Sequence, residues 1–298
     1  MLAIKCAQHY DGVIINADSI QMYDALHVLT AHPSAEEQNA APHKLYGDFN
    51  INEKVTAVSW RDLALKEIQA AHQQNKLPII VGGTGFYIKA LLEGLSPIPD
   101  ADPTVRQQAN ILQKEIGTAA LFKKLQMRDP EMAAKLDPQN TQRVIRAWEV
   151  LEQTGISLAE WHKKPKINPP THLRFFTSII QLPRELIYQR CEHRFDDLLE
   201  SGALEEARWL SAEIAAGRVD DDAAIRKATG YIDLAAYIDG ILTKEEAIQK
   251  AVQHTKNYAK RQLTWLRNQI DANIRLEKPL DFEGLQIAFE KFLHHKIH

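Results

Sequence analysis

The sequence predicts an α/β fold built on a parallel sheet, and three segments carry this prediction. An apolar run that starts at Val13 and ends in Asp18-Ser19 has the composition of a strand buried on both faces. Residues 77–81 form a second such run, followed by a Gly-rich turn. Between the two runs, residues 57–74 repeat their apolar side chains at helical spacing. Strand, helix, strand is the connectivity of a parallel pair, so the amino-terminal part of the chain is expected to be α/β.

The segment ahead of the first strand is helical but has no start signal. Residues 2–8 have the pattern of the middle of an amphipathic helix, with no N-cap residue and no strand ahead of them. The helix after the second strand, by contrast, occupies residues 86–93 and closes on Gly94 as a C-cap. We therefore expect the chain to begin inside a βαβ unit.

The middle of the chain leaves this pattern. Prolines between residues 97 and 103 interrupt it, and residues 104–161 show only short helical periods punctuated by Asp-Pro pairs. This segment is expected to be a helical insertion. The β-favouring run of residues 173–181 then predicts a return to the sheet.

Two long helices are expected to close the chain. The first begins with Pro183, a residue that suits the first turn of a helix. The second begins at the capping box Thr-Lys-Glu-Glu of residues 243–246. The sequence contains no internal repeat and no low-complexity tract.

Composition excludes several classes of protein. The chain has 298 residues, of which 45% are hydrophobic and 25% charged, as is ordinary for a globular protein. No apolar run approaches a membrane span and no signal-peptide core is present, so we expect a cytoplasmic protein with no membrane partner. Cys6 and Cys191 are too few for a disulfide framework or a cysteine zinc site. The net charge of −3 excludes a uniformly basic surface, but cationic residues cluster at 162–166, 184–194 and 256–267.

Asp18 and Ser19 are the first candidate site residues, because open α/β sheets place their chemistry at the carboxyl ends of their strands. Asp18 could serve as a general base, and Ser19 as a ligand of a metal ion or a phosphate. The alternative is that both residues cap the turn after the strand. Gln21 and Tyr23 follow in the same loop, where an amide can read a base edge and a phenol can stack, or both can simply lie at the surface.

Glycines at positions 82, 83 and 85 start the helix that follows the second strand. The amides of a helix N-terminus can bind an anion, and glycines let the anion approach the backbone. The other interpretation is a tight βα turn with no ligand. The segment is not a Walker motif, because it lacks a Lys-Ser/Thr pair and the pattern G-x-x-x-x-G-K-[ST] occurs nowhere in the chain.

Two helical segments combine charged and polar side chains. In the first, Gln142 and Arg146 are one turn apart, while apolar side chains occupy the opposite face. This polar face could bind a ligand, or Arg143, Arg146 and Glu149 could form an ion-pair ladder in solvent. The second segment, residues 256–267, interleaves basic and aromatic side chains, which suits either phosphate contact or packing over a core.

Taken in order and spacing, these segments resemble the tRNA dimethylallyltransferases, also called tRNA isopentenyltransferases. The matching motifs extend over nearly the whole chain, and their ordered combination is far more specific than any one of them. They are residues 17–23 (ADSIQMY), 30–33 (TAHP), 42–43 (PH), 81–87 (VGGTGFY), 94–97 (GLSP), 101–103 (ADP) with Arg106, 142–150 (QRVIRAWEV), 230–231 (GY) and 259–267 (AKRQLTWLR).

The resemblance implies a P-loop NTPase-like α/β core with an inserted helical domain. Residues 1–110 and 172–298 would form the core, and residues 111–171 would form the insertion that grips the anticodon arm of tRNA. It also implies a monomer that uses Mg²⁺ and transfers a dimethylallyl group from dimethylallyl diphosphate to the N6 amine of the adenine next to the anticodon. That adenine must leave its stack to react.

The resemblance further assigns roles to particular residues. Asp18 would be the general base, while Thr84 and Arg106 would face the tRNA and the reacting centre, where an arginine offsets charge developing on the diphosphate. Ser19 is a possible metal ligand, and no other ligand is assigned. The positions at which the family touches its tRNA are, in this chain, Asp18, Ser19, Ile20, Gln21, Thr84, Arg106, Gln142, Arg143, Val144, Ile145 and Arg146.

Two departures from the family pattern stand out. The family begins with G-P-T-A-S-G-K-[ST] ahead of the helix that here starts at Met1, and the lysine and hydroxyl of that segment hold the diphosphate and magnesium. His32 stands where the family usually has lysine. We expect that Met1 is an incorrect start and that the native protein is longer. One alternative is a catalytically inactive tRNA-binding protein. The other is a nucleotide kinase on the same core, and both the missing phosphate loop and the helical insertion disfavour this second alternative.

Overall fold

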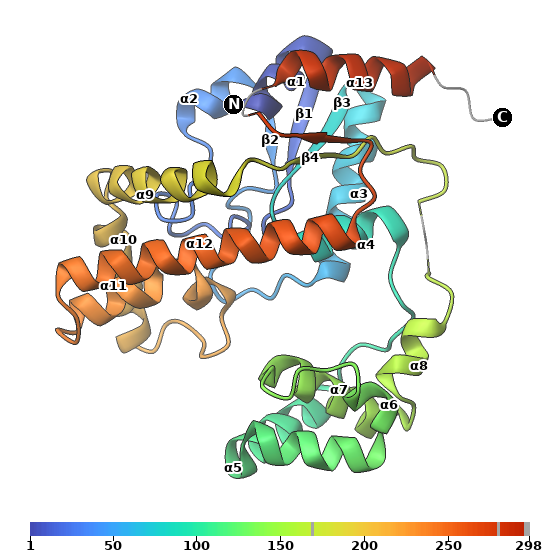
Figure 1. Cartoon of the computed structure of the whole chain (residues 1–298), viewed down its shortest axis with the longest axis vertical. Coiled ribbons are helices and arrows are strands. Elements are labelled where there is room, and N and C mark those ends of the chain that lie inside the picture. The colour runs from blue at the N-terminus through green and yellow to red at the C-terminus, as the bar shows by residue number, and fades with distance from the viewer. Residues whose placement is uncertain (168–169, 279–280, 295–298) are drawn as a thin grey trace. The chain divides into compact units, whose positions relative to one another are not determined.

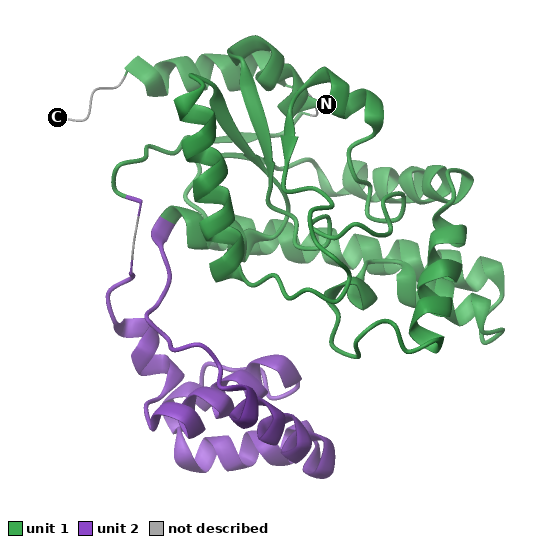
Figure 2. Ribbon diagram, turned by 180° about the vertical axis from the view of Figure 1, so that it is seen from behind, with its two compact units in different colours: residues 1–92, 171–298 green, residues 93–170 purple. Residues whose placement is uncertain are grey.

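The computed structural model describes residues 1–167, 170–278 and 281–294, and the chain divides into two compact units. Unit 1 comprises Met1–Leu92 and Thr171–His298, and unit 2 comprises Glu93–Pro170 (Figure 2). The expected boundary at residue 111 therefore differs from the observed one, which falls at the end of a helix of unit 1. As a consequence, Arg106 belongs to unit 2.

A three-stranded parallel sheet forms the centre of unit 1 (Figure 1). Its order is β2-β1-β3, with β1 at Gly12–Asn16, β2 at His43–Lys44 and β3 at Leu77–Val81. The register pairs Gly12 with Leu77 and Asn16 with Val81, so β1 and β3 end together. The two apolar runs of the sequence are thus confirmed as parallel strands.

Helices cover both faces of this sheet because successive side chains of a strand point to opposite faces. Ile14 packs with Ala7 of α1 (Leu2–Tyr10), whereas Ile15 packs with Trp60 of α3 (Ala57–Gln73). The α1 helix has no side-chain cap at Met1, as predicted. The predicted crossover helix is confirmed as α3, and the helix after β3 is confirmed as α4 (Gly85–Glu93). A short helix, α2 (Ala35–Ala40), lies between β1 and β2 in the chain.

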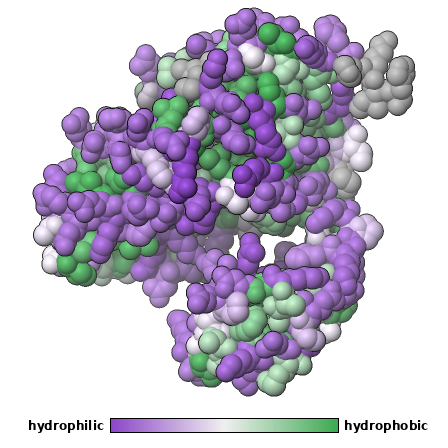
Figure 3. All heavy atoms as spheres, in the orientation of Figure 1, coloured by the Kyte–Doolittle hydropathy of each residue, from purple (hydrophilic) through white to green (hydrophobic). Residues whose placement is uncertain are grey.

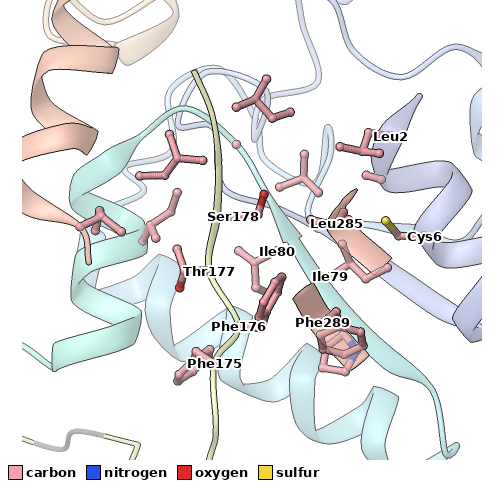
Figure 4. Close-up of a pocket in the computed structure, with 18 of the residues that line it drawn as sticks. Leu2, Cys6, Ile79, Ile80, Phe175, Phe176, Thr177, Ser178, Leu285 and Phe289 are labelled. Atoms are coloured by element: carbon pink, nitrogen blue, oxygen red, sulfur yellow. The ribbon is translucent and has the colours of Figure 1, made fainter. Parts of the chain in front are cut away.

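The expected return of residues 173–181 to this sheet is wrong for the strands that the structure describes. Within that run only β4 (Ser178–Ile180) is a strand, and it pairs in parallel with β5 (Ile274–Leu276) in a separate two-stranded sheet. β-favouring composition predicts a strand but carries no information about its partner. An apolar cavity of about 830 Å³, which Figure 4 shows in close-up, lies beside β3 on the side away from β1. Figure 3 shows apolar side chains reaching the surface among hydrophilic ones in the upper part of the view, where α1, α13 and β4 lie in Figure 1.

The two closing helices are confirmed, and the structure adds others around them. Pro183 is the N-cap of α9 (Arg184–Glu200), and the capping box at Thr243 begins α12 (Lys244–Gln269). In this part of the chain, the helical elements that the sequence pattern did not reveal include α10 (Ala203–Ala215), the 3₁₀ turn Ala224–Lys227, α11 (Tyr231–Ile238) and α13 (Phe282–His294).

Unit 2 is helical, as expected, with a core of its own built from Leu125, Ala147, Val150 and neighbouring apolar side chains. The first helical stretch consists of two helices that meet at a kink at Gly117, whose φ of +78° and ψ of 161° lie outside the helical region. The helical elements of unit 2 are α5 (Pro103–Arg128), α6 (Pro130–Ala133), α7 (Thr141–Thr154) and α8 (Leu158–Lys163). None of the helices in the described parts of either unit is long and apolar enough to cross a bilayer.

Candidate functional site

Asp18 follows β1 by two residues and lies in a turn that fixes its carboxylate. Its Oδ1 accepts hydrogen bonds from the backbone N–H of Ile20 (2.9 Å) and of Gln21 (3.4 Å). Its own N–H donates to Oδ1 of Asn16 at 2.8 Å. The other carboxylate oxygen, Oδ2, has no hydrogen bond to the described residues. The turn-capping interpretation is therefore correct for one oxygen, and the second oxygen is available for chemistry.

Asn16 anchors this turn, and the sequence analysis did not single it out. Its side chain is fully buried, and its amide nitrogen donates to the carbonyls of Asp18 (3.0 Å) and Leu45 (2.9 Å). The indole N–H of Trp60 donates to the carbonyl of Asn16 at 2.8 Å. An asparagine inside an otherwise apolar, doubly buried strand was the available signal, because a buried amide must be hydrogen-bonded.

Thr84 joins the ends of β1 and β3. Its Oγ1 accepts a hydrogen bond from the N–H of Ser19 at 2.9 Å and donates to Oγ of Ser19 at 3.2 Å. Its N–H donates to the carbonyl of Ala17 at 3.1 Å. Asp18, Ser19 and Thr84 are thus brought together at the carboxyl edge of the sheet, where parallel strands end.

The glycines of residues 82–85 are required by close packing. A Cβ at Gly82 would lie 2.2 Å from the carbonyl carbon of Ala17, and one at Gly83 would lie 2.1 Å from Nε2 of Gln262. Nε2 of Gln262 also donates to the carbonyl of Gly83 at 3.1 Å. The structure therefore favours the tight-turn interpretation, and it gives the 256–267 segment of α12 a packing role against this turn.

The loop after Asp18 is held by buried and partly buried contacts. Nε2 of Gln21 donates to the carbonyls of Thr30 (2.9 Å) and Ala31 (2.8 Å), so its amide donors are used within the protein. Tyr23 is 1% exposed and belongs to the core, so the idea that its phenol stacks on a base is wrong. Glu206 of α10 accepts the N–H groups of residues 28 and 29, both at 2.9 Å, and so fixes the far end of this loop.

Two tyrosines near Asp18 are kept protonated by their surroundings. Burial, followed by the negative charges of Asp18 and Glu37, raises the pKa of Tyr46 to about 12. Burial and then the charge of Asp18 also raise the pKa of Tyr258, while a hydrogen bond with Gln262 acts in the opposite direction. Both phenols, which are neutral at physiological pH even at their ordinary pKa, are thereby held still further from ionisation.

His32 does not replace the charge of the family's lysine. Burial and then the neighbouring His27 lower the pKa of its imidazole, so the ring is neutral at pH 7. The two rings stack with centroids 4.5 Å apart, and Nδ1 of His32 lies 2.8 Å from Oγ1 of Thr30. The loss of a fixed positive charge inferred from the sequence is consistent with this environment.

In unit 2, a buried carboxylate holds two of the predicted site residues. Glu149 is 2% exposed, and its oxygens lie 3.5 Å from Nε of Arg106 and 3.4 Å from Nη1 of Arg146. Nη2 of Arg146 also donates to the carbonyl of Pro99 at 3.4 Å. The proposed ion-pair ladder is therefore only partly correct: Arg143 has no ion pair among the described residues, and Arg106 of α5 takes its place.

The remaining residues of α7 differ in their access to solvent. Gln142 and Arg143 are exposed, and Ile145 is partly buried. Val144 is fully buried, so direct contact between its side chain and tRNA is excluded. Val144 instead belongs to the apolar side of α7 that packs into unit 2, and it can only support the residues beside it.

Replacing Glu149 with glutamine tests how Arg106 and Arg146 are held. The amide keeps the shape but loses the charge that attracts both guanidinium groups, so we expect unit 2 to lose about 1 kcal/mol of unfolding free energy, a value reduced by the solvent exposure of Arg106. Urea unfolding would measure this loss. Glu152→Gln, in the exposed pair with Arg128, is the matched control and should change stability by less.

The described residues do not by themselves form a magnesium site. Among them no group of three or more His, Cys, Asp or Glu side chains could hold a metal ion. Ser19, the residue considered as a ligand, has its hydroxyl hydrogen-bonded to Thr84. Since Mg²⁺ is usually bound by one or two carboxylates together with substrate phosphates, Asp18 could hold it only together with groups of the donor.

The sheet and the polar groups at its carboxyl end define an α/β protein with a site at the ends of its strands. The family model described as IPP transferase matches residues 21–269. A tRNA dimethylallyltransferase of Rhodospirillum centenum is 47% identical over 276 residues, which are 93% of this chain and 87% of that protein. One of Paramagnetospirillum magneticum is 42% identical over 294 residues, covering 99% of this chain and 92% of that protein.

Solved structures of tRNA isopentenyl- and dimethylallyltransferases are also similar to this chain. The full-length tRNA isopentenylpyrophosphate transferase of Bacillus halodurans is similar with a TM-score of 0.65 and 31% identity, over 99% of this chain and 94% of that chain. A eukaryotic dimethylallyltransferase acting on tRNA has a TM-score of 0.80 at 22% identity, covering 99% of this chain and 77% of that chain, which shows a shared fold. The chain belongs to the IPP transferase family, and the resemblance found in its sequence is confirmed.

Proposed function

We propose that this protein transfers a dimethylallyl group from dimethylallyl diphosphate to the N6 amine of the adenine next to the anticodon in tRNA. The observation that carries the proposal is the Asp18 carboxylate, which is fixed through Oδ1 and carries a free Oδ2 at the carboxyl end of β1. Membership of the IPP transferase family and relatives called tRNA dimethylallyltransferases supply the substrate class.

In the proposed step, the amine nitrogen attacks the allylic carbon of the donor. A carbon–nitrogen bond forms, the carbon–oxygen bond to the diphosphate breaks, and the diphosphate leaves with the electron pair. Oδ2 of Asp18 accepts the proton that the amine loses. Because two backbone N–H groups hold Oδ1, the carboxylate does not need to be oriented when the substrate arrives.

Thr84 and Arg106 have different parts in this proposal. Thr84 acts through Ser19, whose N–H and hydroxyl it binds, and so keeps the turn that carries Asp18 in place. The resemblance implies that Arg106 offsets charge that develops on the diphosphate, and this role stays a prediction. The requirement for Mg²⁺ stays a prediction, as do the monomeric state and the location in the cytoplasm.

The direct test is incubation of the full chain with dimethylallyl diphosphate and an anticodon stem-loop, with the product analysed by mass spectrometry. A matched stem-loop that carries inosine in place of the adenine has no exocyclic amine and should gain no dimethylallyl group. Because the segment that holds the diphosphate in the family is missing here, the chain as given is expected to bind the first stem-loop but to transfer little, and a version extended by G-P-T-A-S-G-K-[ST] should restore transfer. If both versions bind the stem-loop but never modify it, the protein is a tRNA-binding protein without transferase activity, and the proposal is wrong.

The exposed face of α7 is proposed to contact the phosphates of the anticodon arm. Arg143→Ala should then weaken stem-loop binding and lower the slope of log K against log salt by roughly 0.7–0.9, since one fewer counterion is released. Fluorescence anisotropy at several salt concentrations would measure both quantities. Arg143→Lys is the control and should retain the slope, whereas an unchanged slope in the alanine variant would mean that Arg143 does not touch phosphate.

A further inference from the structure

A strained turn of residues 26–32 follows the Asp18 loop along the chain. The backbone of Leu26 has a φ of +54° and that of Ala31 a φ of +52°, a left-handed conformation that residues other than glycine rarely adopt. The N–H of Thr30 closes the turn by donating to the carbonyl of Leu26 at 2.9 Å. Such strain persists only where surrounding contacts hold the backbone, and it concentrates at functional sites. Contacts from outside the turn are therefore needed to keep both residues in this conformation.

Glu206, in the first turn of α10, supplies such a contact. Its Oε1 accepts the N–H of Val28 and its Oε2 accepts the N–H of Leu29, each at 2.9 Å. A charged acceptor makes each bond stronger than a neutral one would, and two bonds to adjacent amides fix the direction of the turn as well as its position. The side chain of Leu29 is buried in the core, so this part of the turn is held through both its backbone and its side chain.

Gln21 connects the turn to Asp18. Its Nε2 donates to the carbonyls of Thr30 at 2.9 Å and Ala31 at 2.8 Å, so the position of the turn determines where Gln21 lies. The backbone N–H of Gln21 in turn donates to Oδ1 of Asp18 at 3.4 Å. This distance is near the limit for a hydrogen bond, so a small displacement of Gln21 breaks it. Hydrogen bonds therefore lead from Glu206 through the turn and Gln21 to the Asp18 carboxylate.

The neighbouring Glu205 shows what an acidic residue in this helix turn does without such a contact. Acidic residues are favoured in the first turn of a helix because they interact with its dipole, and both Glu205 and Glu206 stand there. The side chain of Glu205 is 68% exposed and lies 4.0 Å from Arg208 in a surface pair. Of these two residues, Glu206 is the one whose carboxylate binds backbone N–H groups of another segment. Its contact with the turn is therefore more than the helix dipole requires.

We propose that Glu206 is a positioning residue for Asp18: by holding the turn of residues 26–32 it keeps Gln21, and through Gln21 the Asp18 carboxylate, in one orientation. The strain at both ends of the turn favours its relaxation, and the two bonds of Glu206 oppose this. The effect on transfer rests on the proposed function, because it requires Asp18 to be the base. The coupling between Glu206 and the amides that bind Asp18 does not depend on that function.

Glu206→Gln tests this coupling, and Glu205→Gln is its matched control. The glutamine keeps the shape of the side chain, but its NH₂ group cannot accept a backbone N–H, and the control makes the same change of charge in the same helix turn. Amide hydrogen exchange in the chain without ligands would be measured at Ile20 and Gln21, whose N–H groups bind Asp18. We expect Glu206→Gln to speed exchange at both amides by at least about tenfold and Glu205→Gln to leave it unchanged.

Gln21→Ala gives an independent test of the same connection. It removes the bonds to the carbonyls of Thr30 and Ala31 but leaves those of Glu206, and it should speed exchange at Ile20 to a similar extent. In the double variant the two effects should not add, because both act through one series of contacts. Additive effects would mean that Glu206 does not act through Gln21 and would overturn the proposal.

A second measurement determines whether this orientation matters for transfer, in a form of the protein with established transfer activity. Single-turnover rates at saturating donor and stem-loop should fall about tenfold in Glu206→Gln, while stem-loop affinity stays within about threefold. A residue that served stability alone would lower the unfolding temperature without separating rate from affinity. Adding Ala31→Gly, which relieves the positive φ at one end of the turn, should restore part of both the rate and the amide protection.

Unchanged exchange at Ile20 and Gln21 in Glu206→Gln would overturn the proposal. So would equal acceleration by Glu205→Gln, because it would assign the effect to the charge of the helix turn. Faster exchange together with a wild-type transfer rate would show that Asp18 does not need this support, and would overturn the positioning role. If no version of the protein modifies the stem-loop, the proposed function is wrong, and the exchange result alone decides whether Glu206 holds the Asp18 turn.

Discussion

Asp18→Asn is expected to lower the rate of dimethylallyl transfer about a hundredfold or more while leaving stem-loop affinity within about twofold, because loss of a general base typically costs 10²–10⁴. The asparagine carbonyl can still accept the N–H groups of Ile20 and Gln21, so the turn is kept. Its amide cannot take a proton from the attacking amine. Single-turnover rates and equilibrium binding, measured in a form of the protein with established transfer activity, would separate the two effects.

Two further variants make this result specific. Ser19→Ala removes a hydroxyl beside Asp18 but leaves the carboxylate, so the rate should fall far less than in Asp18→Asn. Asp18→Ala removes both the base and the acceptor for the turn and should lower stability as well. If Asp18→Asn turned over at the wild-type rate, Asp18 would have no part in proton transfer, although the family assignment would stand.

The central elements were predictable because their signals are local. The apolar runs of β1 and β3, the helical period of α3 and the capping box at Thr243 each identify an element from its own residues. The strand-end position also singled out Asp18 and Ser19, whereas Thr84, which binds Ser19, was identified only through the family resemblance.

The strand pairing and side-chain contacts that could not be predicted join residues that lie far apart in the sequence. Nothing in residues 173–181 indicates that β4 pairs with β5, almost a hundred residues later. The contact of Arg106 with Glu149 and that of Gln262 with Gly83 likewise join different helices and turns. Whether a loop residue can bind a ligand likewise depends on its burial in the folded chain. Tyr23 has the sequence position of a loop residue, but its neighbours enclose its side chain in the core.

The glycine turn of residues 82–85 positions a site residue through close packing. The turn does not need an anion to explain its glycines, because Gly82 lies against Ala17 and Gly85 lies against Trp265. With these contacts the start of α4 packs closely against the end of β1. Thr84 then lies within hydrogen-bond distance of Ser19. Close packing of the turn is therefore what brings the second strand end to the Asp18 loop.

Gly82→Ala tests this explanation and should lower the free energy of unfolding by about 3 kcal/mol, at the upper end of the usual cost of overpacking. The added Cβ would lie within 2.2–2.7 Å of three backbone atoms of Ala17, and the paired strands leave that backbone no room to move. Urea unfolding would measure the loss.

Gly83→Ala is the matched control for that substitution. Its Cβ would meet Nε2 of Gln262, the end of a flexible side chain that can swing away at the cost of one hydrogen bond, about 1 kcal/mol. Adding Gln262→Ala to Gly83→Ala should then lower stability no further, because that bond is already lost. Equal losses from Gly82→Ala and Gly83→Ala would mean that the contact with Ala17 yields as easily as a side chain, and that close packing does not fix the turn.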